Sequence, residues 1–304
     1  MKRDAFSGCH PVINLIFYIL VVGMTMFTRN PVILGLSLLS GTLYALNLSG
    51  FRTCLKLLAG SLPLSLSVIV FNGLFNHRGM TVLFTFPGGN AFTLESLIFG
   101  LCSALLLEAV LIWLHSFYRI MSMEKTIFLF GRIIPDLGLV VSMAGRLVPL
   151  YLKTIRRTAE LAEMTGRGIR QGGPVRRIKN TAGILSIALT WALEHGISTA
   201  RSMKMRGYGL VGRTSYELYH FHRRDVILLL IMIPAGILGV IAYLSGLCYW
   251  TTFPVIMEIG TGPLSLILYG VFFAFSLMPV LLQAGEEISW NRYLNSKTIP
   301  SDTI

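Results

Sequence analysis

Long stretches without any charged side chain dominate this sequence and limit what the chain can fold into. Residues 5–51 contain a single charge, at Arg29. Further charge-free runs include 57–77, 96–107, 109–118, 226–257 and 259–285. Only 13% of the 304 residues are charged, about half the share of a typical soluble domain, and the mean hydropathy is +0.68. This composition excludes a water-soluble monomer and a disordered chain.

A helix needs about 20 apolar residues to cross a bilayer, and the charge-free runs provide six such segments. The predicted membrane spans are Val12–Thr28, Pro31–Leu48, Leu57–Phe75, Leu97–Phe117, Val226–Trp250 and Gly262–Leu282. We therefore expect an all-α integral membrane protein with about six transmembrane helices. Pro87, Gly88 and Gly89 indicate a turn between the third and fourth spans.

The charges divide the chain into three regions: N-terminal membrane helices (1–118), a basic membrane-proximal region (119–225), and C-terminal membrane helices with a tail (226–304). Residues 146–225 carry 15 basic and 5 acidic side chains, which is +10 of the chain's net +12. The positive-inside rule predicts that this block is cytoplasmic. Four spans precede it and two follow, so both termini are expected in the cytoplasm. Arg29 and Arg78 then lie outside, against the rule.

The basic block contains two predicted helices. Apolar residues repeat at helical spacing over Leu147–Arg167, and a second helix is expected from Pro174, a favourable first position, to Arg206. Its segment Thr181–Leu193 has no charge and is apolar on all sides, which is typical of a helix buried in protein or lipid. We expect two long helices at the inner membrane face, with basic side chains meeting anionic lipid rather than nucleic acid.

Both predicted helices end in an arginine followed by a glycine, Arg167-Gly168 and Arg206-Gly207. One interpretation is ordinary helix-end chemistry, in which glycine adopts the left-handed conformation and arginine offsets the helix dipole. The other is functional: two arginines projecting into water, far apart, that dock two copies of a partner with acidic or carbonyl-lined grooves. The spacing alone leaves both open.

At these residues the chain resembles the transmembrane component of energy-coupling factor (ECF) transporters, the EcfT/CbiQ family. That family has two short motifs, most often Ala-Arg-Gly, at the ends of two cytoplasmic coupling helices. Gly166-Arg167-Gly168 and Met205-Arg206-Gly207 match at the arginine and the second glycine and depart at the first position. Other similar stretches are His10-Pro11, Asn72 to Phe84, Ser122 to Lys125, Pro135 and Arg146 to Pro149.

The resemblance implies a non-catalytic scaffold of a vitamin or metal-ion importer, such as a cobalt transporter, in a bacterial or archaeal cell membrane. It implies two partner ATPases of the ABC type, which hold ATP and Mg²⁺, and a small substrate-binding membrane protein (S component). Arg167 and Arg206 would contact the ATPases, with Gly168 and Gly207 closing the helices beside Gly166 and Met205. ATP-driven motion of these helix ends would make the S component topple and release its cargo. No cofactor is expected on this chain.

Alternative functions centre on other residues. The sequence has no G-x-x-x-x-G-K-[ST] loop and no recognisable catalytic set, so we expect no ATPase or other enzyme activity. Glu108 lies in the middle of a predicted span, where a charge costs about 3 kcal/mol. It is either an intramembrane ion site of a stand-alone transporter or channel, or a hydrogen-bonded packing residue. His220 and His222 are expected to be interfacial anchors rather than metal ligands. A membrane-embedded enzyme is a further alternative.

Overall fold

The computed structural model describes residues 5–297, except 86–90, 134, 209–218, 220, 247, 249, 255, 258, 259 and 261. The chain forms two compact units: unit 1 comprises residues 1–122 and 219–304, and unit 2 comprises residues 123–218.

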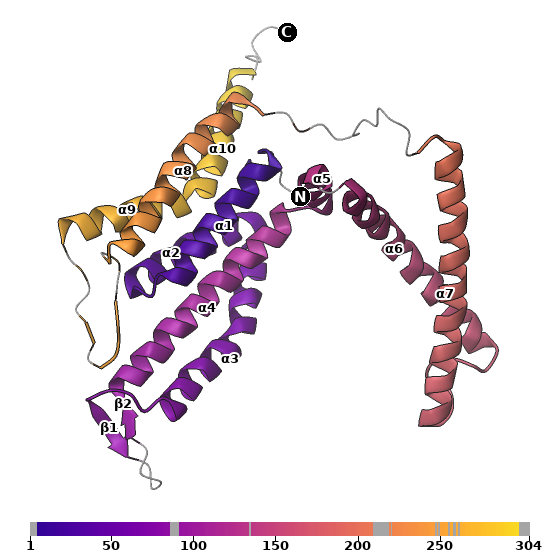
Figure 1. The fold of residues 1–304 in the computed structure, drawn as a ribbon, viewed down its shortest axis with the longest axis horizontal. Coiled ribbons are helices and arrows are strands. Elements are labelled where there is room, and N and C mark those ends of the chain that lie inside the picture. Colours follow the sequence, from indigo (N-terminus) through magenta and orange to yellow (C-terminus); the bar gives the residue numbers. More distant parts are fainter. Residues whose placement is uncertain are drawn as a thin grey trace, which may run out of the picture. The chain divides into compact units, whose positions relative to one another are not determined.

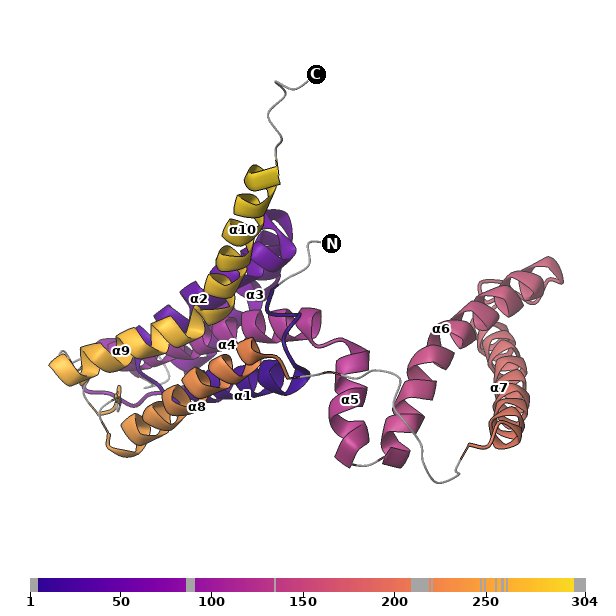
Figure 2. The same ribbon diagram turned by 90° about the horizontal axis from the view of Figure 1, so that it is seen from above.

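Unit 1 is a helical bundle with one small hairpin (Figures 1 and 2). Its elements are α1 (Pro11–Phe27), α2 (Pro31–Ser49), α3 (Phe51–Phe75), β1 (Val82–Thr85), β2 (Ala91–Thr93), α4 (Leu94–Ile120), α8 (Arg223–Leu244), α9 (Pro263–Ser276) and α10 (Met278–Lys297). Among the described residues, α2, α3, α4 and α8 are long and apolar enough to cross a membrane. The bent pair α9–α10 provides a fifth candidate span, and α1 is an apolar helix of 17 residues. The expected all-α membrane fold is confirmed.

The last predicted span is broken. The sequence predicts one helix over Gly262–Leu282, but α9 ends at Ser276 and the following helix, over Met278–Trp290, is bent from it by 52°. Pro279 explains the break, because it has no N–H to donate to the carbonyl of the preceding turn and disfavours helical geometry at the residue before it.

Two other predicted boundaries were wrong by six residues. The third span begins at Phe51 instead of Leu57, directly after Gly50, whose φ of 78° separates α2 from α3. The fifth ends at Leu244 instead of Trp250, because Gly246 has a φ of 74° and terminates α8. Both glycines adopt the left-handed conformation that other residues rarely adopt.

Two strands that the sequence did not predict join α3 to α4. β1 and β2 pair in antiparallel fashion, with Val82 opposite Thr93 and Phe84 opposite Phe92. The predicted turn at 87–89 lies outside the described residues. Glu95, 2% exposed, fixes the chain before β1, since its Oε1 accepts from the Thr81 amide at 3.1 Å and from the Thr81 hydroxyl at 2.5 Å.

The first two helices begin with the same device. Each starts with proline at its first position, and the preceding side chain accepts a hydrogen bond from the amide of the next valine. His10 Nδ1 accepts from Val12 N at 3.3 Å, and Asn30 Oδ1 accepts from Val32 N at 3.0 Å. These caps satisfy amides that the first turn leaves without partners.

The core of unit 1 is aromatic, and a chain of hydrogen bonds crosses it. Phe17, Tyr44 and Trp113 are fully buried, in a cluster that joins α1, α2 and α4 to α8 and α9. Trp113 Nε1 donates to Ser37 Oγ at 3.0 Å, and Ser37 shares a 2.8 Å hydrogen bond with Thr25. Three helices are thus linked by hydrogen bonds, which supplement close packing where lipid removes the hydrophobic driving force.

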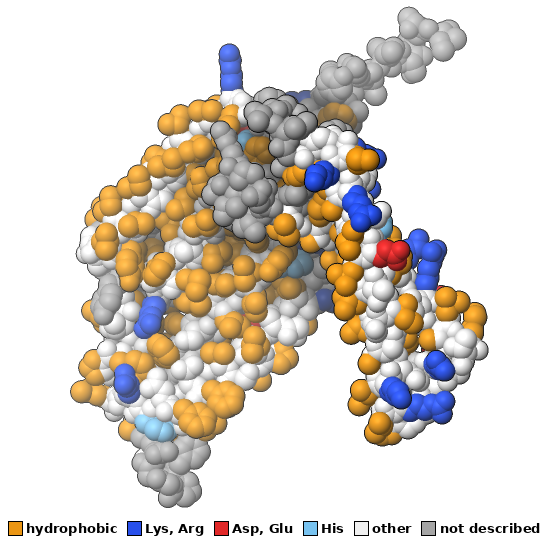
Figure 3. Space-filling model, turned by 45° about the vertical axis from the view of Figure 1, so that its right-hand side comes forward, with side chains coloured by type: hydrophobic (Ala, Val, Ile, Leu, Met, Phe, Trp, Pro, Cys, Tyr) orange, Lys and Arg blue, Asp and Glu red, His pale blue; other side chains and the backbone are white. Residues whose placement is uncertain are grey.

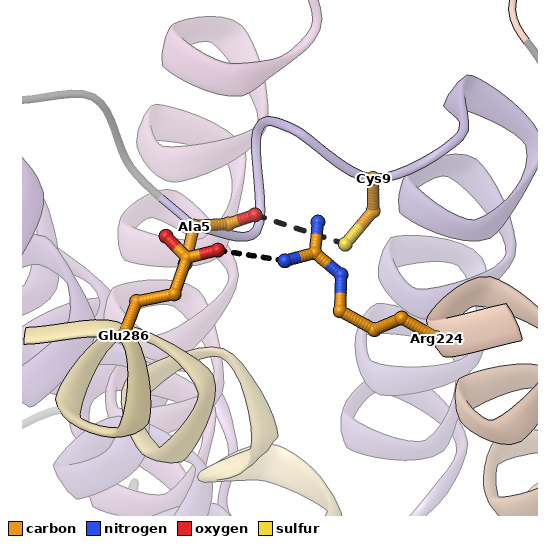
Figure 4. A network of polar contacts seen from close by, with 4 residues as sticks. All are labelled: Ala5, Cys9, Arg224 and Glu286. Atoms are coloured by element: carbon orange, nitrogen blue, oxygen red, sulfur yellow. Dashed lines mark hydrogen bonds and ion pairs between the residues drawn. The ribbon is translucent and has the colours of Figure 1, made fainter. Parts of the chain in front are cut away.

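An ion pair joins α8 to α10 beside the N-terminal segment (Figure 4). Arg224 contacts Glu286 at 2.6 Å, and Cys9 lies next to the guanidinium, with its thiol directed to the carbonyl of Ala5 at 3.8 Å. Both charged side chains are about half exposed, so we expect this pair to contribute little to stability. Its position ties the start of the chain to two C-terminal helices.

Unit 2 contains α5 (Met123–Ile133), α6 (Pro135–Met164) and α7 (Pro174–Met205). The start of α6 was predicted wrongly: the helix begins at Pro135, not Leu147, and continues through Pro149. α5 was not predicted. α7 is unbroken over its 32 residues despite Gly183 and Gly196, and it packs against α6 through the edge-to-face pair Tyr151–Trp191, whose ring centroids are 5.8 Å apart.

Candidate functional site

The end of α6 is a Schellman motif centred on Gly166. Gly166 has a φ of 72°, its amide bonds to the Glu163 carbonyl at 3.2 Å, and the Arg167 amide bonds to the Ala162 carbonyl at 2.8 Å. These bonds satisfy carbonyls that the last turn leaves open. Gly166 therefore terminates the helix, and Arg167 directly follows this glycine.

The expectation that Gly168 closes this helix was wrong, because Gly166 already does so two residues earlier. Glycine at position 168 allows a close approach to α6: an added Cβ would lie 2.5 Å from Glu163 Cγ. A larger residue would therefore require the Glu163 side chain to move.

Two amide side chains that the sequence analysis did not identify hold this loop. Gln171 Oε1 accepts from the Gly168 amide at 3.0 Å, while its Nε2 donates to the Glu163 carbonyl at 3.3 Å. Asn180, on α7, donates to the Gly168 carbonyl at 3.0 Å. The peptide that follows Arg167 is thus fixed to both helices. The only sequence signal was the polar Asn180 beside the uncharged segment of α7.

The end of α7 has the same motif with the arginine in a different place. Gly207 has a φ of 77°, its amide bonds to the Lys204 carbonyl at 3.1 Å, and the Tyr208 amide bonds to the Met203 carbonyl at 3.0 Å. Gly207 closes this helix, as expected. Arg206 is the capping residue before the left-handed glycine, whereas Arg167 follows its own.

The ends of α6 and α7 correspond in the geometry of their caps and not in the position of the Arg-Gly sequence. Met164 and Met205 are both the last helical residue, and they are 83% and 90% exposed. Arg167 and Arg206 are both exposed, and within the described residues neither guanidinium has a hydrogen-bond or ion-pair partner. Each helix end therefore exposes one methionine and one arginine at the surface.

The structure keeps the two ends far apart. Asn180 holds the Arg167 loop near the start of α7, and Arg206 caps the other end of the same helix. At about 1.5 Å per residue, α7 rises about 39 Å between Asn180 and Arg206. The two arginines therefore form two separate contact points, not one site.

Surface chemistry differs between the two units. Figure 3 shows hydrophobic side chains covering the visible face of unit 1, whereas Lys and Arg side chains gather over α6 and α7. A surface of this apolar character suits lipid contact, and the basic helices suit acidic partners or anionic headgroups.

Glu108 lies at the α3–α4 interface and is 8% exposed. Ser61 donates to its Oε2 at 2.7 Å, and Ser65 donates to its Oε1. The two serines lie four residues apart on one face of α3, which the sequence analysis did not relate to Glu108. Both carboxyl oxygens thus have hydroxyl donors, an arrangement that joins two membrane helices.

The structure describes one of the two histidines considered as metal ligands. His220 lies outside the described residues, and the His222 amide donates to Asp225 Oδ2 at 3.1 Å at the start of α8. In the part of the chain that is described, no group of three His, Cys, Asp or Glu side chains has the proximity needed to hold a metal ion.

Comparison with known proteins identifies similar chains of one name. No family model matches this sequence. The energy-coupling factor transporter transmembrane protein EcfT of Lactobacillus helveticus is 30% identical over 95 residues, and that of Leuconostoc gelidum is 27% identical over 93 residues. These matches cover 31% and 30% of this chain and span only about a third of the relatives' length, 34% and 35%. EcfT of Streptococcus equi is 23% identical over 244 residues, covering 74% of this chain and 87% of the relative.

Proposed function

We propose that this chain is the transmembrane scaffold of an ECF-type importer, in which α6 and α7 couple two partner ATPases to a separate substrate-binding membrane subunit. The observation that carries the proposal is the pair of helix ends. Each presents an exposed arginine beside an exposed methionine on a tightly hydrogen-bonded cap. The similarity to proteins named EcfT supports it.

The geometry suits a mechanical role. An arginine can form several hydrogen bonds with a carboxylate or with backbone carbonyls of a partner. Because the Arg167 loop is hydrogen-bonded to both α6 and α7, displacing it moves both helices. An ATPase bound at each end would thus transmit its opening and closing into the arm formed by α6 and α7. ATP and Mg²⁺ belong to the partners, and this chain performs no chemistry.

In the proposed orientation the arm is cytoplasmic, together with both termini, in the plasma membrane of a bacterium or archaeon. Its net charge supports a cytoplasmic location, since residues 146–225 carry +10 and basic segments are retained in the cytoplasm. The transported solute, a vitamin or a metal ion, would bind to the partner subunit.

The test is co-purification of the tagged chain from its host, analysed by native mass spectrometry. We expect two ATPase subunits and one small membrane protein with the natural chain, and loss of the ATPases with Arg167→Glu/Arg206→Glu. The matched control is Arg156→Glu/Arg201→Glu, which makes the same charge change at exposed positions of the same helices. A complex that survives the first double substitution, or is lost equally in the second, contradicts the proposal.

The alternative of a stand-alone transporter using Glu108 has a separate test. In the structure both oxygens of this carboxyl group accept hydrogen bonds from Ser61 and Ser65 of α3, which suits a residue that joins two helices. We expect Glu108→Gln to leave solute uptake by the assembled complex unchanged. Uptake by the purified chain alone, abolished by Glu108→Gln, would establish the alternative instead.

A further inference from the structure

A cavity of about 510 Å³ opens at the end of unit 1 where α1 ends and α2 begins. This volume is within the range of small-molecule sites. The walls come from the end of α1, from α2, α4 and α8, and from Cys248 and residues 250–253. The cavity is distinct from the helix ends of unit 2, and the proposed function assigns it no role.

Most of the lining residues are apolar, and those in the inner part of the cavity are buried. Leu34 of α2, Cys102 of α4 and Trp250 form one buried cluster, and Phe99 and Leu106 extend the lining along α4. Trp250 is held in place because its Nε1 donates to the Met257 carbonyl at 2.9 Å. Such a surface binds an aliphatic or aromatic body and cannot stabilise a charge.

The polar part of the lining carries one cation. Arg29 contributes to the cavity together with the hydroxyl residues Thr28, Thr251 and Thr252, and none of the described lining residues is acidic. Arg29 is exposed, and no described side chain forms an ion pair with it. A single cation beside hydroxyl groups, at the mouth of an apolar cavity, is complementary to an anion with an apolar body.

The loop that carries Arg29 is fixed on both sides. Thr28 is 8% exposed and its amide bonds to the Met24 carbonyl at 3.1 Å. Asn30 is 1% exposed, caps α2, and donates to the Tyr269 hydroxyl at 2.8 Å. The backbone of Arg29 is therefore positioned before any ligand arrives, which lowers the entropy lost on binding.

The same arginine is anomalous in the sequence. It is the single charge in residues 5–51, and in the proposed orientation it lies outside, where the positive-inside rule disfavours it.

We propose that this cavity binds an anionic amphiphile, with its carboxylate or phosphate on Arg29 and its aliphatic body between α2, α4 and Trp250. This ligand chemistry has two sources: the anionic phospholipids of the bilayer, or a free fatty-acid-like carboxylate from solution. The proposal is independent of the ATPase partners, so it stands or fails separately from the coupling function.

Tryptophan quenching by brominated chains tests the site directly, because Trp250 lines it. The probes are 12-bromododecanoate and phosphatidylglycerol with brominated chains, with brominated phosphatidylcholine as the neutral comparison, added to the complex in mild detergent. We expect saturable quenching by at least one anionic probe and not by phosphatidylcholine. Trp250→Phe should remove that response, which assigns it to Trp250 rather than to Trp113, Trp191 or Trp290.

Variants of the lining decide the role of Arg29. Arg29→Gln should raise the Kd about tenfold or more, since a charge-assisted contact is lost, whereas Arg29→Lys should retain most of the affinity. Arg78→Gln is the matched control, because Arg78 is an exposed arginine at the same end of the bundle and does not line the cavity. Ser103 of α4 also lines the cavity, so Ser103→Phe should abolish quenching by filling the space.

The outcomes are decisive in both directions. Tighter quenching by bromododecanoate than by the brominated phosphatidylglycerol identifies a free carboxylate as the ligand, and the reverse order identifies a bilayer lipid. Equal Kd values for Arg29→Gln and Arg78→Gln, or equal quenching by phosphatidylcholine, would overturn the proposal.

Discussion

The hydrogen bonds of Glu108 allow a quantitative prediction, because the three polar side chains depend on each other unequally. The Ser61→Ala/Ser65→Ala double substitution leaves the buried Glu108 carboxyl without its two donors. Interhelical hydrogen bonds in membrane proteins contribute about 0.6 to 1.7 kcal/mol each. The double substitution should therefore lower the free energy of unfolding by about 1–3 kcal/mol.

Removal of the acid should cost less. In Glu108→Leu both serine hydroxyls keep backbone acceptors, since Ser61 Oγ lies 3.1 Å from the Leu57 carbonyl and Ser65 Oγ lies 3.0 Å from the Ser61 carbonyl. No buried donor is left without a partner, and a carboxyl group is removed from a membrane span. We expect a loss below about 1 kcal/mol. The triple substitution should resemble Glu108→Leu.

The assay is reversible unfolding in mixed detergent–SDS micelles, followed by tryptophan emission and by circular dichroism. A double-mutant cycle then isolates the coupling between the acid and the serines, which we expect to be about 1–3 kcal/mol. Ser67→Ala is the control, because Ser67 lies on α3 but bonds to the Pro63 and Leu64 carbonyls. Strict additivity, or a Glu108→Leu variant less stable than the serine double variant, would refute this reasoning.

Two further predictions concern helix ends. Gly166→Ala should cost about 1–2 kcal/mol locally, because alanine resists the left-handed conformation. Amide hydrogen exchange over residues 161–171 should therefore accelerate. The control is Gly183→Ala, which lies in open space: it should stabilise α7 and leave exchange over residues 161–171 unchanged. Burial lowers the pKa of His10, against the opposing charge of Asp225, so the folded state binds fewer protons than the unfolded state. Stability should therefore decrease as the pH falls below about 6.5. His10→Asn should keep the helix cap, as Asn30 does on α2, and should remove this pH dependence in thermal unfolding. An equal slope of unfolding temperature against pH in both proteins would contradict the assignment to His10.

The sequence by itself determined the membrane helices. Runs without charge mark the spans because lipid excludes charged groups, and prolines after His10 and Asn30 mark two helix starts because proline fits the first turn without its missing N–H. The break at Pro279 was also readable in principle, but the apolar run on either side of it predicted one continuous helix. Hydropathy identifies what lipid tolerates and does not report where a helix bends.

Tertiary structure decided the details on which function depends. Gly166 closes α6 because its amide and that of Arg167 form hydrogen bonds with carbonyls of the last turn. The Arg-Gly sequence alone does not predict that geometry. Asn180 and the two serines beside Glu108 act across helix interfaces, and the cavity at Arg29 has walls from four separate stretches of the chain. Local patterns could not predict these sites, because each is formed by residues that only helix packing brings together.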